Sequence, residues 1–314
     1  MKYTISYKST IDSQFTYVLT LLPSEIRGAL YDFCLDNGYE TINEIRIKRN
    51  SYIYLIAESK NVKTSIYINE EIIKKIFDCL CNGSLYAHIN TIKEGYVSVG
   101  NGVRAGICGS AVLESNEITA IKDITSINIR IPHHIEGASS FIYSLLKNEG
   151  FNSSILIYSP PGVGKTSILR DLVVKLSECD PPRRYAVIDS REEIITSFSS
   201  SAICDAYISY PKGTAIELAT KSMTPEIIIC DEIANENEAN AILKASHSGV
   251  KLIATTHASS FEEIKNKKIL SDLLKGEVFT YFVGVSREYG EKKYRFTVDK
   301  IKKEALVWKL LVVD

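Results

Sequence analysis

The second half of the chain carries short runs of consecutive apolar residues, each followed by a polar or glycine-containing segment. These runs predict strands at residues 154–158, 185–189, 226–231 and 250–255. Helices are predicted at 139–147, 165–178 and 236–247. Strands that are apolar without alternation are typically buried on both faces. The second half is therefore predicted to be an α/β domain, with a parallel sheet covered by helices on both faces.

The first half has a different pattern, with short alternating or apolar runs and few long helical segments. Strands are predicted at 42–48, 51–56, 95–102, 103–109 and 126–131, and a helix at 70–81. Asn101-Gly102 is predicted to form the positive-φ turn of a hairpin. At the end of the chain, 278–286 and 293–298 are predicted to pair as antiparallel strands across a turn at 288–291. We expect two domains, a smaller α+β domain over 1–135 and the α/β domain over 136–314, joined near 133–140.

The composition supports two globular domains and argues against some functions. The 314 residues are 45% hydrophobic and 24% charged, so each half can bury a core. The net charge of -1 argues against a generally basic nucleic-acid binder. The N-terminus has no signal-peptide pattern, and no apolar run approaches the ~20 residues of a membrane span, so we expect a soluble, cytoplasmic protein. The seven cysteines include no C-x-x-C pair and are expected to be reduced thiols.

A glycine-containing loop lies between an apolar strand and a helix, which is the arrangement that cradles a triphosphate. Gly162 and Gly164 would let the backbone curl around the phosphates, while Lys165 would reach the β and γ phosphates and Thr166 would hold Mg²⁺. The usual pattern opens with glycine, where this chain has Ser159. The predicted cofactors are ATP and Mg²⁺. The predicted binding residues are Ser159, Pro160, Pro161, Gly162, Val163, Gly164, Lys165, Thr166 and Ser167.

Polar residues also follow the other predicted strands of the second half, and the carboxyl ends of parallel strands meet at one edge of a sheet. Asp231 is predicted to bind Mg²⁺ beside Thr166, and Glu232 to orient and deprotonate the attacking water. Thr255, Thr256 or His257 is predicted to contact the γ phosphate, and for His257 an ordinary histidine at a strand end is the alternative. Asp189 and Glu193 are predicted to act at the same edge. The predicted catalytic set of a Mg²⁺-dependent NTP hydrolase is Lys165, Asp189, Glu193, Glu232 and His257.

No arginine in the second half is an evident partner for the transferred phosphate. Arg46, Arg104 and Arg130, all on strand-like segments of the first half, are candidates to reach the nucleotide of a neighbouring subunit. An ordinary surface position is the alternative for each of them. If one of them acts in this way, the active enzyme is a ring.

These motifs, in their order along the chain, resemble the stage III sporulation protein AA family, which belongs to the type II/type IV secretion ATPase superfamily. The resemblance extends from about Leu21 to His257. It rests on 106–111, 124–131, the phosphate loop, 188–194, 222–233, 245–250 and 254–257.

The resemblance implies a RecA-like P-loop NTPase core after a smaller α+β N-terminal domain, and hexameric rings. It implies the cytoplasmic ATPase of a sporulation channel in the mother cell, peripheral at the outer forespore membrane through membrane-protein partners. The family's phosphate-loop lysine matches Lys165, its acidic pair Asp231 and Glu232, its aspartate box 189–193 and its histidine box His257. The chain departs from the family pattern at Ser190, at Ala234-Asn235 and at Pro132-His133-His134.

Two alternatives remain open from the residues. One is a RecA-like ATPase that handles nucleic acid through its first half. Against it, the basic residues of that half look scattered, with no basic stripe interleaved with aromatics, so no nucleic-acid partner is expected. The other is a nucleotide-dependent scaffold that hydrolyses slowly.

Overall fold

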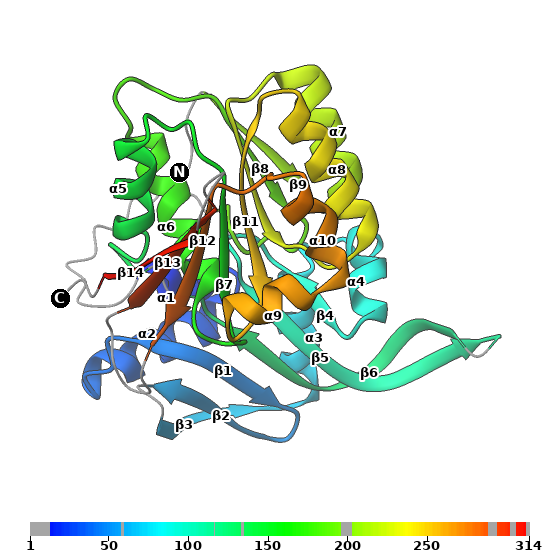
Figure 1. Ribbon diagram of the computed structural model, residues 1–314. Helices are drawn as coiled ribbons and strands as arrows, with labels where there is room; N and C mark the ends of the chain where they lie inside the picture. The colour runs from blue at the N-terminus through cyan, green and yellow to red at the C-terminus, as the bar shows by residue number, and fades with distance from the viewer. Residues whose placement is uncertain are drawn as a thin grey trace. The chain divides into compact units, whose positions relative to one another are not determined.

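The computed structural model describes residues 13–57, 60–115, 117–132, 135–195, 203–287, 294–301 and 306–311. The chain divides into two compact units, Met1–His133 and His134–Asp314 (Figure 1). His133 and His134, which belong to the predicted connection, lie outside the described residues.

The first unit contains a six-stranded antiparallel sheet in the order β3-β2-β1-β6-β5-β4. The strands are β1 Ile42–Lys48, β2 Ser51–Ala57, β3 Lys60–Ile68, β4 Tyr96–Ser98, β5 Arg104–Glu114 and β6 Glu117–Arg130. The helices are α1 Ser13–Thr20, α2 Ser24–Asp36, α3 Glu70–Leu80 and α4 Ile89–Lys93, with a short 3-10 helix at Leu85–His88.

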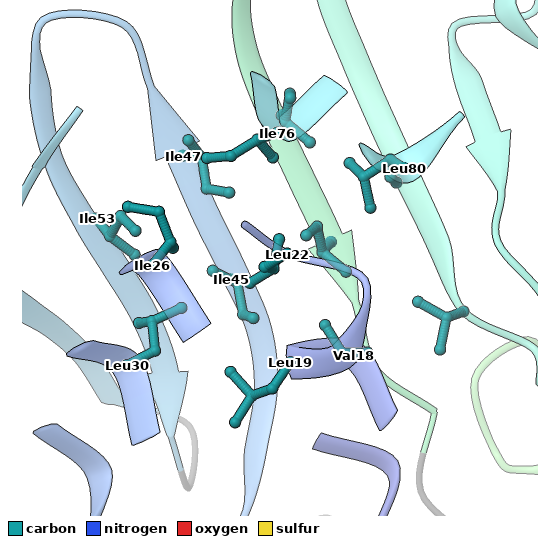
Figure 2. Close-up of a cluster of buried hydrophobic side chains, with 14 of the residues drawn as sticks. Val18, Leu19, Leu22, Ile26, Leu30, Ile45, Ile47, Ile53, Ile76 and Leu80 are labelled. Atoms are coloured by element: carbon teal, nitrogen blue, oxygen red, sulfur yellow. The ribbon is translucent and has the colours of Figure 1, made fainter. Parts of the chain in front are cut away.

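One face of this sheet carries the core of the first unit. Alternation along β1 points Ile45 and Ile47 to that face, where they lie across from buried residues of β6. Apolar residues of α1, α2 and α3 cover them, and Figure 2 shows the resulting cluster. The labelled side chains are Val18, Leu19, Leu22, Ile26, Leu30, Ile45, Ile47, Ile53, Ile76 and Leu80.

Several predictions for the first half are confirmed, including the strands β1 and β2 and the helix α3. Asn101 and Gly102 have φ of 51° and 75°, as the hairpin prediction requires. The helices α1 and α2 and the strand β3 were not predicted. The predicted strand at 126–131 was too short, because β6 continues outward with β5 as a two-stranded arm whose mostly exposed side chains give no burial pattern.

The second unit contains an eight-stranded sheet in the order β14-β13-β12-β7-β11-β10-β8-β9. The strands from β12 to β9 are parallel, and β13 and β14 pair antiparallel at one edge. The strands are β7 Ile155–Ser159, β8 Tyr185–Asp189, β9 Cys204–Ile208, β10 Ile227–Glu232, β11 Lys251–His257, β12 Tyr281–Ser286, β13 Arg295–Ile301 and β14 Leu306–Leu311.

Helices cover both faces of this second sheet, as predicted. The core on one face includes residues of α5 and α6, and the core on the other includes residues of α7, α8, α9 and α10 (Figure 1). Their bounds are α5 Ser140–Asn148, α6 Lys165–Ser177, α7 Lys212–Leu218, α8 Glu236–His247, α9 Phe261–Asn266 and α10 Lys268–Lys275, with a π-helix at Ala219–Met223. β12 and β13 pair antiparallel as predicted, whereas the predicted turn at 288–291 lies outside the described residues.

The strand order decides which residues share the functional edge. β7, β11, β10 and β8 are parallel neighbours, so their carboxyl ends lie side by side. These ends carry Ser159, His257, Glu232 and Asp189. None of the helices in the described part of the chain has the length and apolar character needed to cross a bilayer. All seven cysteines are free thiols, and four of them are buried.

Candidate functional site

The loop between β7 and α6 has the backbone conformation that a phosphate cradle needs. Gly162 and Gly164 have φ of 79° and 119°, which side-chain-bearing residues rarely adopt. α6 begins at Lys165, and no side chain caps its N-terminus. The first N–H groups of that helix are therefore available to an anion.

Tyr294 gives a second reason for glycine at position 164. A Cβ at Gly164 would collide with the Tyr294 hydroxyl and would lie 3.2 Å from two of its ring carbons. Burial raises the pKa of the Tyr294 phenol, so the hydroxyl stays neutral above the loop. The sequence had no signal for this contact, because Tyr294 belongs to the far end of the chain.

Lys165 is a buried cation whose direct contacts are all neutral groups. Its Nζ donates to the Ser159 carbonyl at 3.1 Å, to the Ser159 hydroxyl at 3.2 Å and to the Pro160 carbonyl at 3.5 Å. Burial lowers the pKa of Lys165, and the nearby charge of Glu232 opposes that shift. A bound anion would stabilise the charge of an ammonium in this position. Ser159, which departs from the usual glycine, supplies two of the acceptors.

His257 connects Lys165 to Glu232. Lys165 Nζ lies 2.8 Å from His257 Nδ1, and His257 Nε2 lies 3.1 Å from a Glu232 carboxylate oxygen. Because an ammonium can only donate, Nδ1 accepts, and Nε2 then carries the proton that is donated to Glu232. The structure thus brings together three of the predicted site residues in one chain of hydrogen bonds. A bound phosphate would compete with His257 Nδ1 for the hydrogen bond that Lys165 donates.

Asp231 is paired with a lysine that the sequence did not single out. Lys212 Nζ lies 2.5 Å from Asp231 Oδ1 and 3.6 Å from Glu238 Oε2, and it also donates to the Glu232 carbonyl. Its side chain is only 6% exposed. A lysine at a helix start gives no sequence signal for such burial.

Asn235, where the chain departs from the family pattern, caps α8. Its side chain accepts from the Glu238 N–H at 3.0 Å, while Glu238 accepts from the Ala234 N–H at 2.8 Å. This reciprocal arrangement is a variant of the capping box. It orients the Glu238 carboxylate beside Lys212.

Asp189 has a structural environment rather than an open catalytic one. Its buried carboxylate accepts from the backbone N–H groups of Glu193, Ile194 and Ile195, at 2.9, 2.8 and 2.9 Å. Burial raises the pKa of Asp189, and these three hydrogen bonds oppose the shift. Arg170 on α6 donates to the Glu193 carbonyl and ties the same turn to the phosphate-loop helix. The predicted catalytic roles of Asp189 and Glu193 stay untested.

Asp189→Asn is expected to destabilise the protein by about 2 kcal/mol, because an amide nitrogen cannot accept the hydrogen bonds that the lost oxygen received. Urea unfolding of the variant and of the wild-type protein measures this difference. A variant of unchanged stability that has lost activity would instead support the catalytic role of Asp189.

The three predicted arginines lie on the face of the first sheet opposite the core, where Arg46 and Arg130 are exposed and Arg104 is partly buried. Arg130 is across from Glu44 and Arg104 in neighbouring strands, and Arg46 is across from Asn128. Arg46 forms an ion pair with Glu44 at 3.1 Å, and Arg104 stacks over Tyr96 at 5.1 Å. The fold thus groups residues that are far apart in the sequence.

The same face also carries tyrosines and lysines. Tyr52, Tyr54 and Tyr67 are exposed, Lys63 is across from Tyr54 and lies over the Tyr52 ring at 4.4 Å, and Lys48 is exposed on β1. The expectation of scattered basic residues without interleaved aromatics was wrong in this respect. Residues that are separated along β1, β2 and β3 become neighbours only when the strands pair.

The donor set fits Mg²⁺ that is bound together with a nucleotide. Among the described residues, no group of three or more His, Cys, Asp or Glu side chains is placed to hold a metal ion alone. Mg²⁺ commonly takes one or two protein oxygens and completes its shell with phosphate oxygens and water. Thr166 in the first turn of α6 and Asp231 at the end of β10 are residues of this type.

The parallel sheet, the phosphate-type loop and the acidic end of β10 define the RecA-like P-loop NTPase fold. Solved structures agree with this fold. The ATPase DotB of Legionella pneumophila superposes with a TM-score of 0.62 at 14% identity, covering 88% of this chain and 81% of that one. The pilus retraction motor PilT, solved with bound ADP, gives 0.62 at 11% identity, covering 87% and 83%.

The chain belongs to the family described as sporulation stage III, protein AA, whose pattern matches residues 13–300. Stage III sporulation protein AA of Bacillus subtilis (strain 168) is 30% identical over 284 residues, which are 87% of this chain and 91% of that relative. The family expectation from the sequence motifs is confirmed.

Proposed function

We propose that the protein is a Mg²⁺-dependent ATPase of the secretion-motor type. The observation that carries this proposal is the Lys165 ammonium, which is buried in a glycine loop at an uncapped helix start and contacts only neutral acceptors directly. Such an arrangement is stabilised by a polyphosphate. The fold shared with DotB and PilT supports the proposal.

Each residue has a proposed role in this reaction. Lys165 and the N–H groups at the start of α6 bind the phosphates, and Thr166 and Asp231 hold Mg²⁺, which neutralises phosphate charge when bound. Glu232 orients the attacking water and accepts its proton. His257 holds Glu232 in place through Nε2 and releases Lys165 to the phosphate.

We further propose that the protein works as a hexamer in the mother cell, at the outer forespore membrane, with membrane proteins of a sporulation channel as partners. Membership of the sporulation family supports this setting. In such a ring, Arg46, Arg104 or Arg130 would reach a neighbour's nucleotide.

A second candidate function is nucleic-acid handling. The exposed face of the first sheet, with its arginines, lysines and tyrosines, is the kind of surface on which single-stranded nucleic acid stacks. This observation favours the candidate, although the net charge of -1 does not.

The purified protein is expected to hydrolyse ATP in the presence of Mg²⁺, and hydrolysis is expected to stop when EDTA removes the metal. Turnover is expected below the ~10 s⁻¹ typical of enzymes, because the side chains of Lys165 and Glu232 contact Ser159, Pro160 and His257, and none of these partners is an arginine that could stabilise the transferred phosphate. Phosphate release measures hydrolysis, and a fluorescent ATP analogue measures nucleotide binding. Absence of both would contradict the proposal. Stimulation of hydrolysis by a labelled single-stranded oligonucleotide that binds in a salt-dependent way would favour the second candidate.

A further inference from the structure

Lys212 is a buried cation at the place where a metal ion is proposed to bind. Three oxygen-bearing groups surround its ammonium: the Asp231 carboxylate at 2.5 Å, the Glu238 carboxylate at 3.6 Å and the Glu232 carbonyl. Because the ammonium lies against two carboxylates, its charged form is favoured in spite of its burial.

The arrangement is too specific for a surface lysine. A lysine at a helix start normally keeps its ammonium in water, since burying it is costly unless it is paired. Lys212 instead reaches inward from the first residue of α7 to the end of β10. The α8 cap fixes Glu238, whose carboxylate lies close enough to the Lys212 ammonium to interact with its charge.

We propose that Lys212 is a positioning residue that occupies Asp231 as a built-in cation, so that a divalent ion binds Asp231 only together with a nucleotide. This inference rests on the proposed function. A free divalent ion must compete with the ammonium for the same carboxylate. An ion that arrives with a nucleotide also brings phosphate oxygens, which supply the remaining contacts. The hydrogen bond from Lys212 to the Glu232 carbonyl fixes the neighbouring backbone at the same time.

The test is a titration of nucleotide-free protein with Mn²⁺ alone, followed by electron paramagnetic resonance and by thermal unfolding. Lys212→Met is expected to bind Mn²⁺ at least about tenfold more tightly than the wild-type protein, since one decade requires only ~1.4 kcal/mol and the substitution removes a charge in direct contact with Asp231. In the absence of metal, its melting temperature is expected to fall. Unchanged or weaker Mn²⁺ binding would overturn the proposal and leave Lys212 a structural role only.

Lys244→Met is the matched control. Lys244 lines the same pocket of about 590 Å³ as Lys212, but it is exposed and pairs with Glu217 at 3.0 Å. Its substitution is expected to leave the Mn²⁺ affinity unchanged.

Two further variants keep the test decisive if Lys212→Met folds poorly. Lys212→Arg retains the charge and is expected to bind Mn²⁺ as weakly as the wild-type protein, so tight binding by this variant would contradict the proposal. Lys212→Met combined with Asp231→Asn is expected to regain thermal stability and to lose the gain in Mn²⁺ affinity, and retention of that gain would also contradict it. Binding of a fluorescent ATP analogue is measured on the same preparations. Its absence in the wild-type protein would refute the proposed function independently of the Mn²⁺ result.

Discussion

Lys165→Ala is expected to lower the affinity for ATP by at least about a hundredfold, or ~3 kcal/mol. The Lys165 ammonium is buried at the loop and contacts only neutral groups directly. Alanine removes the charge and leaves the backbone N–H groups alone to meet the phosphates. Equilibrium binding of a fluorescent ATP analogue, with and without Mg²⁺, measures the loss.

Lys147→Ala provides the control for this substitution. Lys147 is an exposed lysine near the end of α5, and its replacement removes the same charge without touching the loop. ATP affinity is expected to be unchanged in the control. Full ATPase activity in Lys165→Ala would contradict the proposed ATPase function of this site, whatever the control shows.

Glu232→Gln is expected to bind ATP normally and to hydrolyse it more slowly by a factor on the order of 10²–10⁴. The glutamine oxygen can still accept the hydrogen bond from His257 Nε2, so the geometry at the end of β10 is preserved. The amide cannot take a proton from water. Single-turnover phosphate release measures the rate, and the binding assay verifies that the nucleotide is retained.

The same variant tests the ring. With ATP held but not turned over, a nucleotide-dependent hexamer is expected to accumulate in sedimentation velocity experiments. Glu236→Gln, at an exposed position in the first turn of α8, is the matched control and is expected to hydrolyse ATP like the wild-type protein. A Glu232→Gln variant that stays monomeric with ATP would count against hexamer formation.

The second unit could be predicted well because its signals are local. The strand β8 and the helix α8 begin and end at the predicted residues, Tyr185–Asp189 and Glu236–His247. Apolar runs without alternation and a glycine loop between strand and helix report burial and turn geometry over a few residues. β9 and α7 were not predicted, since the partly exposed residues of β9 do not form an apolar run.

The first unit was predicted less completely for a related reason. α2 has buried residues at Ile26, Leu30 and Cys34, a helical spacing, but they are separated by polar and charged residues that weaken the pattern. The arm formed by β5 and β6 exposes most of its side chains, so burial leaves no periodic signal there. Local patterns predict an element only where burial in the core requires apolar residues at regular positions.

The sequence by itself determined the parallel α/β core, the phosphate-type loop and the residue types at the ends of β7, β10 and β11. These features depend on neighbouring residues, so the order of residues is sufficient to indicate them. Only the tertiary structure decided how those ends are connected. His257 contacts Lys165, 92 residues before it, and also Glu232. Tyr294 covers Gly164, and Lys212 pairs with Asp231. Such contacts join residues that are distant in the chain, and no local pattern carries information about them until the strands pair and the helices pack.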